Sequence, residues 1–93
     1  MRILLIGDIV GEPGRRLVQQ CVPVLREQRS LDLVIANAEN AAAGSGVTPA
    51  IYQALIDAGV DGITLGDHVY RKKEIGKTLE KQPNIIRPAN FPV

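Results

Sequence analysis

The sequence predicts an α/β protein, with a three-layer α/β/α arrangement around a mostly parallel sheet of three to four strands. Short apolar runs alternate with helical patterns along the chain, and this alternation is typical of parallel strands joined by right-handed helical crossovers. The chain has two tyrosines, one phenylalanine and no tryptophan. Its core is therefore expected to consist of Ile, Leu, Val and Ala, the usual filling between parallel strands and helices.

Four segments have the character of strands. The first of them, residues 2–7, is a continuous apolar run rather than an alternating one, which favours a strand covered on both faces. The predicted strands are residues 2–7, 31–36, 60–65 and a short fourth segment at 84–87.

The first helix is expected to begin near Pro13, because proline fits a first helical turn, and to end near Arg29. Pro23 lies inside this segment and removes one backbone hydrogen bond, so we expect a kink or a split there. The apolar stripe, in which Cys21 is expected to be a core residue, consists of Leu17, Val18, Cys21, Val22 and Leu25.

Two further helices follow. Thr48 and Pro49 form a helix opening, since Thr accepts a bond from an orphan N–H and Pro fits the first position. Gly59 is a plausible stop for this helix. A third helix is predicted over residues 71–81, with Ile75 and Leu79 facing inward.

The bulk properties indicate one small domain, residues 1–93. The 11 basic and 10 acidic residues give a net charge of +1, which gives no signature of nucleic-acid or anionic-membrane binding. The apolar runs are too short to span a bilayer, and Asp8 interrupts the first run, so no leader pattern is expected. The single cysteine cannot form an internal disulfide, and a cytoplasmic location is the default expectation.

Acidic residues follow three successive predicted strands. Asp8 follows the first, Glu39 with Asn40 the second, and Asp67 with His68 the third. The carboxyl ends of parallel strands share one edge of the sheet, where ligands bind. Converging carboxylates repel one another unless a cation lies between them. Oxygen ligands with an imidazole suit Mn, Fe or Zn, so the pattern predicts a divalent-metal site.

Each of these residues also has an ordinary explanation. Asp8 is equally well explained as a turn or helix-cap aspartate, and Glu39 with Asn40 as ordinary loop polarity. A lone loop histidine such as His68 is usually not catalytic. The occurrence of all of them at three successive strand ends is what favours a functional site.

The first loop contains Gly7, Gly11 and Gly14, whose spacing matches neither the dinucleotide fingerprint nor a P-loop. The adjacent Arg15 and Arg16 could help a helix N-terminus to bind an anion. We expect them instead to form a solvated helix face.

Four stretches, residues 1–16, 32–42, 62–68 and 87–92, together resemble the YmdB-like family of bacterial metallophosphoesterases, in the calcineurin-like superfamily. The resemblance is collinear and covers only the N-terminal part of that family's fold. It implies that residues 1–93 form about half of a metallophosphoesterase fold, a domain incomplete relative to the family.

The resemblance also implies a function. Family members are two-metal phosphodiesterases that hydrolyse cyclic nucleotides such as 2′,3′-cyclic AMP, with Fe or Mn the expected metals. By resemblance, Asp8 would bind the first metal, Glu39 would bridge both, and Asn40 would be a ligand or a neighbour of one. Asp67 would bind the second metal, and His68 would protonate the leaving oxygen after attack by metal-activated water.

Two departures from the family pattern qualify this expectation. Asp67 stands where the family has Asn, and no histidine follows His68, although the family's remaining metal ligands are C-terminal histidines. The sequence thus predicts a fragment or truncated homologue with weak or no activity by itself. The alternative is a non-catalytic α/β module that binds a ligand or associates with itself. A flavodoxin-like domain would explain the alternation of strands and helices but not the polar residues Glu39, Asn40, Asp67 and His68 at the strand ends. A half-sheet exposes an edge and an apolar face, so homo-oligomers are expected.

Overall fold

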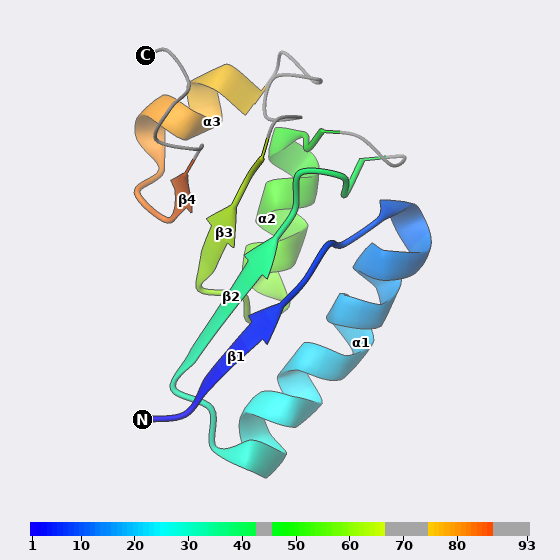
Figure 1. Cartoon of the computed structure of the whole chain (residues 1–93), viewed down its shortest axis with the longest axis vertical. Coiled ribbons are helices and arrows are strands. Elements are labelled where there is room, and N and C mark those ends of the chain that lie inside the picture. The colour runs from blue at the N-terminus through cyan, green and yellow to red at the C-terminus, as the bar shows by residue number, and fades with distance from the viewer. Residues whose placement is uncertain (43–45, 67–74, 87–93) are drawn as a thin grey trace.

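The computed structural model describes residues 1–42, 46–66 and 75–86. Its centre is a four-stranded parallel sheet in which the strands lie in chain order (Figure 1). This arrangement confirms the predicted α/β class and the mostly parallel sheet. The strands are β1 (Ile3–Ile6), β2 (Leu33–Asn37), β3 (Gly62–Thr64) and β4 (Ile85–Ile86).

Three helices connect the strands: α1 (Gly11–Arg29), α2 (Pro49–Asp57) and α3 (Ile75–Lys81). Since right-handed crossovers that advance in one direction place their helices on one face of a sheet, all three are expected on the same side. The buried cluster agrees, because it joins residues of the three helices to the sheet: Val18, Val22, Tyr52, Leu55, Ile75, Val34, Ala36 and Ile63.

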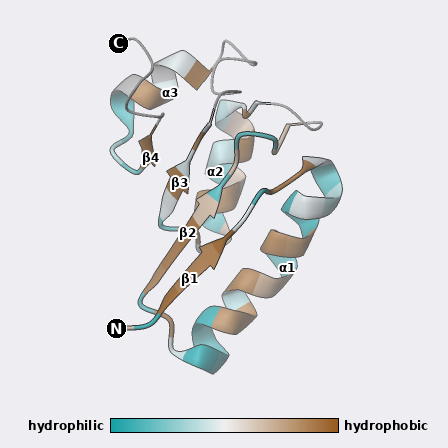
Figure 2. Cartoon of the chain, viewed as in Figure 1, coloured by the Kyte–Doolittle hydropathy of each residue, from teal (hydrophilic) through white to brown (hydrophobic). Residues whose placement is uncertain are grey.

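The two faces of the sheet differ in exposure. Val34, Ala36 and Ile63 face the helices and are fully buried. On the other face, Ile3 is 50% and Leu5 72% exposed, although β1 and β2 are strongly hydrophobic along their length (Figure 2). The helices therefore supply one layer beside the sheet, and the second face remains largely open, as expected for half of a three-layer fold.

Helix α1 begins at Gly11, two residues before the expected start, since the Gly14 N–H already donates to the Val10 carbonyl at 3.2 Å. The Gly11 N–H has no acceptor within the helix and donates to the carbonyl of Asn40 at 3.1 Å. The helix is continuous through Pro23, so the expected split is wrong. Pro23 is exposed, and water can reach the carbonyl that loses its partner. The predicted end at Arg29 is confirmed, with Ser30 in the left-handed conformation (φ 51°). Cys21 is only half-buried rather than a core residue.

The other predicted elements are also present. The Thr48 hydroxyl accepts a hydrogen bond from the Ile51 N–H at 3.2 Å. Helix α2 ends at Asp57, and Gly59, two residues later, has a φ of 112° that lets the chain leave the helix direction. In α3, Ile75 is buried and Leu79 packs against the core, as predicted. The start expected near residue 71 lies outside the described residues. In the part of the chain that is described, no helix is long and apolar enough to cross a membrane.

An ion pair links α1 to the amino-terminal ends of β2 and β3, opposite the carboxyl ends of the strands. Arg26 donates to Asp61 at 2.5 Å and to the Gly59 carbonyl at 2.9 Å, and Asp61 also accepts from the Val34 N–H at 2.8 Å. Partial burial raises the pKa of Asp61, but the hydrogen bonds from Arg26 and Val34 and the charge of Arg26 outweigh it, so the pKa lies below its ordinary value of 3.8.

Candidate metal centre

The loops that leave β1, β2 and β3 are held together beyond the strand ends. The Ile9 N–H donates to the Asn37 carbonyl at 3.1 Å, and the Ala38 N–H donates to the Thr64 carbonyl at 3.0 Å. These bonds extend the sheet ladder past its last paired residues. Asp8, Glu39 and Gly66 therefore leave the sheet at one edge, which is the arrangement that the sequence predicted.

A side-chain hydrogen bond joins two of the predicted metal-binding residues. Asn40 Nδ2 donates to Oδ1 of Asp8 at 2.9 Å, across a separation of 32 residues. The Asn40 carbonyl also accepts from Gly11 at the start of α1. Asp8 is exposed and Asn40 half-buried, so the carboxylate is accessible while its neighbour is anchored.

Glu39 approaches the third loop. A Cβ built on Gly66 would overlap the carboxyl group of Glu39, so this carboxyl group packs directly over the glycine. The requirement at Gly66 is for space rather than for an unusual backbone conformation. The segment that leads to Asp67 and His68 thus begins beside Glu39.

The loop that carries Glu39 and Asn40 is closed by backbone hydrogen bonds. The Ala42 N–H donates to the Gly46 carbonyl at 2.9 Å, the Ala41 N–H donates to the Ala38 carbonyl at 3.1 Å, and the Gly46 N–H donates to the Glu39 carbonyl. Ala41 and Ala42 are buried. The small residues here therefore form a tight, packed turn that fixes the backbone of the two site residues.

Arg15 contributes to this loop in a way that sequence reasoning missed. Its Nη1 donates to the Ala41 carbonyl at 2.6 Å, whereas Arg16 pairs with Glu12 on the surface. Only Arg16 thus fits the solvated helix face expected for both. No local signal separates the two arginines, because both lie near the same helix N-terminus, where a cation opposes the helix dipole.

The described residues bring Asp8, Glu39 and Asn40 to one edge, while Asp67 and His68 lie outside the described residues. Across residues 1–42, 46–66 and 75–86, no group of three or more His, Cys, Asp and Glu side chains is gathered closely enough to hold a metal ion. Two carboxylates and an amide are nonetheless the oxygen ligands that hard divalent cations prefer. The donor chemistry of this edge therefore fits such a cation.

The parallel sheet, with helices between its strands, defines an α/β protein, and in open α/β sheets ligands bind at the carboxyl edge of the strands, where the polar loops of this chain lie. The family model described as "YmdB-like protein" matches residues 4–93. The chain belongs to this family, as its resemblance predicted.

Two named relatives match this chain over nearly its whole length. It is 51% identical over 92 residues to a 2′,3′-cyclic-nucleotide 2′-phosphodiesterase of Bacillus subtilis, with 99% of this chain and 35% of the relative covered. It is 37% identical over 91 residues to a putative phosphatase/phosphodiesterase of Mycoplasma genitalium, covering 98% of this chain and 32% of that protein. The chain therefore spans about a third of the length of the curated relatives that it matches.

Solved structures show the same fold. A hypothetical protein from Thermus thermophilus superposes with a TM-score of 0.91 at 46% identity, covering 99% of this chain and 35% of the other. A phosphatase from Mycoplasma pneumoniae superposes with a TM-score of 0.88 at 33% identity, covering 97% and 32%. Both matches establish that this chain has the fold of part of a YmdB-like protein.

Proposed function

We propose that this chain is the N-terminal part, or a truncated homologue, of a two-metal phosphodiesterase that hydrolyses cyclic nucleotides such as 2′,3′-cyclic AMP. The observation that carries the proposal is the hydrogen bond between Asn40 and Asp8, with the Glu39 carboxyl group on Gly66 at the same edge. The name of the Bacillus subtilis relative supports the substrate class. The single cysteine, which cannot form an internal disulfide, favours a cytoplasmic location.

Asp8 and Glu39 would hold the divalent metals, with Asn40 as a further ligand or as the group that orients Asp8. Asp67 would complete the predicted set, since an Asp oxygen ligates as an Asn oxygen does and adds negative charge. Manganese or iron fits these oxygen donors. When bound, two such metals would supply a polarised phosphodiester and an activated water.

The side chains of this chain would have two tasks: they would orient the metal-binding carboxylates and donate a proton to the leaving oxygen. The hydrogen bond from Asn40 leaves Asp8 in one orientation at the exposed edge, and Gly66 leaves room for the Glu39 carboxyl group. His68 would donate a proton to the leaving oxygen. The extra negative charge of Asp67 would attract a cation and repel a phosphate, which favours metal binding over turnover.

The test is hydrolysis of 2′,3′-cyclic AMP and of bis-p-nitrophenyl phosphate with added Mn²⁺, combined with a measurement of bound metal. We expect Mn²⁺ to bind to the wild type and to be lost in Glu39→Gln, with slow hydrolysis at most and none in His68→Ala. Glu27→Gln is the matched control, because it removes an exposed carboxylate near the other end of α1. Hydrolysis that survives both site variants, or no Mn²⁺ binding at all, would refute the proposal.

A non-catalytic module that associates with itself is the second candidate. The open, apolar edge at β1 favours it. The two candidates separate cleanly, because the module predicts association that is unaffected by Glu39→Gln and no metal-dependent hydrolysis.

A further inference from the structure

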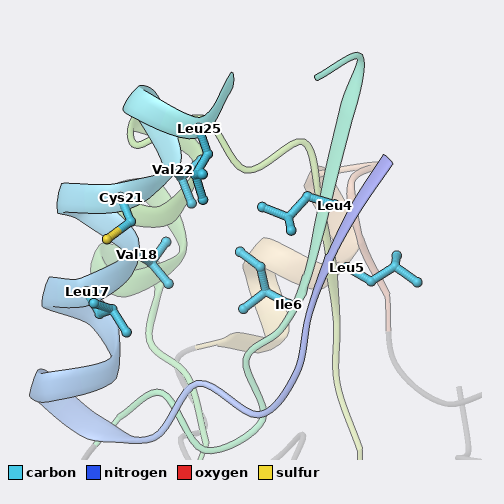
Figure 3. A pocket seen from close by; sticks show the side chains of 8 residues that line it. All are labelled: Leu4, Leu5, Ile6, Leu17, Val18, Cys21, Val22 and Leu25. Atoms are coloured by element: carbon cyan, nitrogen blue, oxygen red, sulfur yellow. The ribbon is translucent and has the colours of Figure 1, made fainter. Parts of the chain in front are cut away.

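Asn37 ends β2 on the face of the sheet that lies away from the helices. Side chains alternate between the two faces of a strand, and Figure 3 shows this on β1, where Leu4 and Ile6 point toward α1 and Leu5 points away from it. Leu5 pairs in register with Ile35. Ile35 and, two residues later, Asn37 therefore share the face of Leu5.

Thr64 is the register partner of Asn37 on β3, and its side chain lies on the same face. Both residues are half-buried. The other residues of the four described strands on this face are apolar or glycine: Ile3, Leu5, Leu33, Ile35, Gly62 and Ile86. A strand end is an ordinary place for polar residues, so the role of this pair depends on what its side chains contact.

The Asn37 side chain connects the loop after β2 with the end of β3. Its Oδ1 accepts from the Glu39 N–H at 3.4 Å, and its Nδ2 donates to Oγ1 of Thr64 at 3.4 Å. The first bond turns the backbone before Glu39, as Asn side chains do in Asx-turns. The second bond ties that turn to β3. Both bonds are long, so each is weak by itself, and their effect comes from the segments that they join.

The backbone of Asn37 contacts the remaining loop. Its carbonyl accepts from the Ile9 N–H at 3.1 Å, and Ile9 directly follows the proposed metal ligand Asp8. Asn37 is thus bonded to the loop after β1, to the loop that carries Glu39 and to the end of β3. These are the three segments from which the candidate metal centre is built.

We propose that Asn37 is a positioning residue of the metal centre, which fixes Glu39 relative to β3 without contacting the metal. This inference rests on the proposed function, in which the Glu39 carboxyl group holds metal. That carboxyl group packs over Gly66, just beyond β3. Glu39 is therefore held against β3 twice, by its N–H through Asn37 and Thr64 and by its carboxyl group at Gly66.

Asn37→Val separates this role from a purely structural one. Valine suits a half-buried strand position on an apolar face, so the free energy of unfolding in urea should be unchanged or increased. Mn²⁺ affinity, measured by isothermal titration calorimetry, should nevertheless decrease by about tenfold, the usual effect of losing a group that orients a ligand. Ile35→Val is the matched control on the same strand and face, and it should bind Mn²⁺ as the wild type does.

Thr64 offers a second pair of variants. Thr64→Val keeps the shape of the side chain but removes the acceptor of the bond from Asn37, so it should weaken Mn²⁺ binding. Thr64→Ser keeps the hydroxyl group and should retain the wild-type affinity. The losses in Asn37→Val and Thr64→Val should not add in the double variant, because both changes break the same contact. Additive losses, or equal affinities of Thr64→Val and Thr64→Ser, would contradict the proposal.

Amide hydrogen exchange in the metal-free chain distinguishes failure of this inference from failure of the proposed function. The Glu39 amide should exchange about twofold to threefold faster in Asn37→Val than in the wild type, as expected for loss of a weak hydrogen bond. An unchanged Glu39 amide, or a wild type and Asn37→Val that bind Mn²⁺ equally well, would overturn the inference. A wild type that binds no Mn²⁺ would refute the proposed function, and with it any role of Asn37 toward a metal, even where the amide exchanges faster.

Discussion

Asn40 Nδ2 lies 2.9 Å from Oδ1 of Asp8 and donates a hydrogen bond to it. The two residues leave neighbouring parallel strands, and their backbones are also linked, because the Ile9 N–H donates to the Asn37 carbonyl and the Gly11 N–H to the Asn40 carbonyl. This contact joins two of the three loops of the predicted site directly. The proposed metal binding at this edge would therefore depend on it and on the groups that support it.

Removal of the amide in Asn40→Ala should weaken Mn²⁺ binding by about tenfold or more, the usual effect of losing a group that orients a metal ligand. Isothermal titration calorimetry measures the effect. Gln53→Ala is the control, since Gln53 donates a similar bond, 2.9 Å long, to Asp57 on α2. Equal affinity in Asn40→Ala and the control would show that Asn40 does not act on the metal.

Gly66→Ala should displace the Glu39 carboxyl group, because the added methyl group would occupy its space. Mn²⁺ affinity should decrease and the protein should lose stability in urea unfolding. Gly76→Ala is the matched change in α3, where a Cβ meets no atom within 4 Å. It should stabilise the protein by about 0.5–1 kcal/mol, since Ala favours a helix over Gly. Similar behaviour of the two variants would contradict the close packing of Glu39.

Arg15→Ala should loosen the turn that carries Glu39 and Asn40, because it removes the hydrogen bond to the Ala41 carbonyl. Mn²⁺ affinity should decrease, whereas the neighbouring Arg16→Ala, which removes only an exposed pair with Glu12, should leave it unchanged. Surface pairs of that kind contribute about 0–1 kcal/mol to stability. The same titration compares both variants, and an unchanged Arg15→Ala would argue against the role of this arginine.

Asp61→Asn should destabilise the protein near neutral pH by about 1 kcal/mol, a modest value because the ion pair is partly exposed. The pKa of Asp61 is lower in the folded state than its ordinary value of 3.8. The stabilisation is therefore fully present above about pH 4 and is lost as the pH falls through the lower folded value. The difference between wild type and Asp61→Asn in urea unfolding should shrink below about pH 4. Asp57→Asn, which changes an exposed carboxylate at the end of α2, is the matched control near neutral pH.

Much of the fold could be predicted because local signals agreed with the tertiary structure. Thr48 with Pro49 opens α2, and Ile75 and Leu79 face inward, as the pattern indicated. Helix was expected on both sides of Pro23, and only the alternative of a split is wrong, because the proline lies on an exposed helix face where it is tolerated. The start of α1 at Gly11, whose N–H donates to the Asn40 carbonyl, involves a partner that no local pattern reveals.

The site could be predicted in part. Acidic residues at successive strand ends indicated that Asp8, Glu39 and Asn40 would meet, since parallel strands share their carboxyl edge. The contacts that hold those residues in place could not be predicted from the sequence. The overlap between Gly66 and Glu39 and the bond from Arg15 to Ala41 depend on distances between segments that only the fold brings together.

The proposed function requires that divalent metal bind between the loops that follow β1, β2 and β3. Titration of the isotope-labelled chain with Mn²⁺, followed by paramagnetic broadening of its amide signals, tests this claim most directly. We expect the amides of Asp8, Glu39, Asn40 and Gly66 to broaden first and together, and Glu39→Gln to abolish the effect. Broadening centred on Asp57, or spread evenly over the exposed carboxylates, would contradict it.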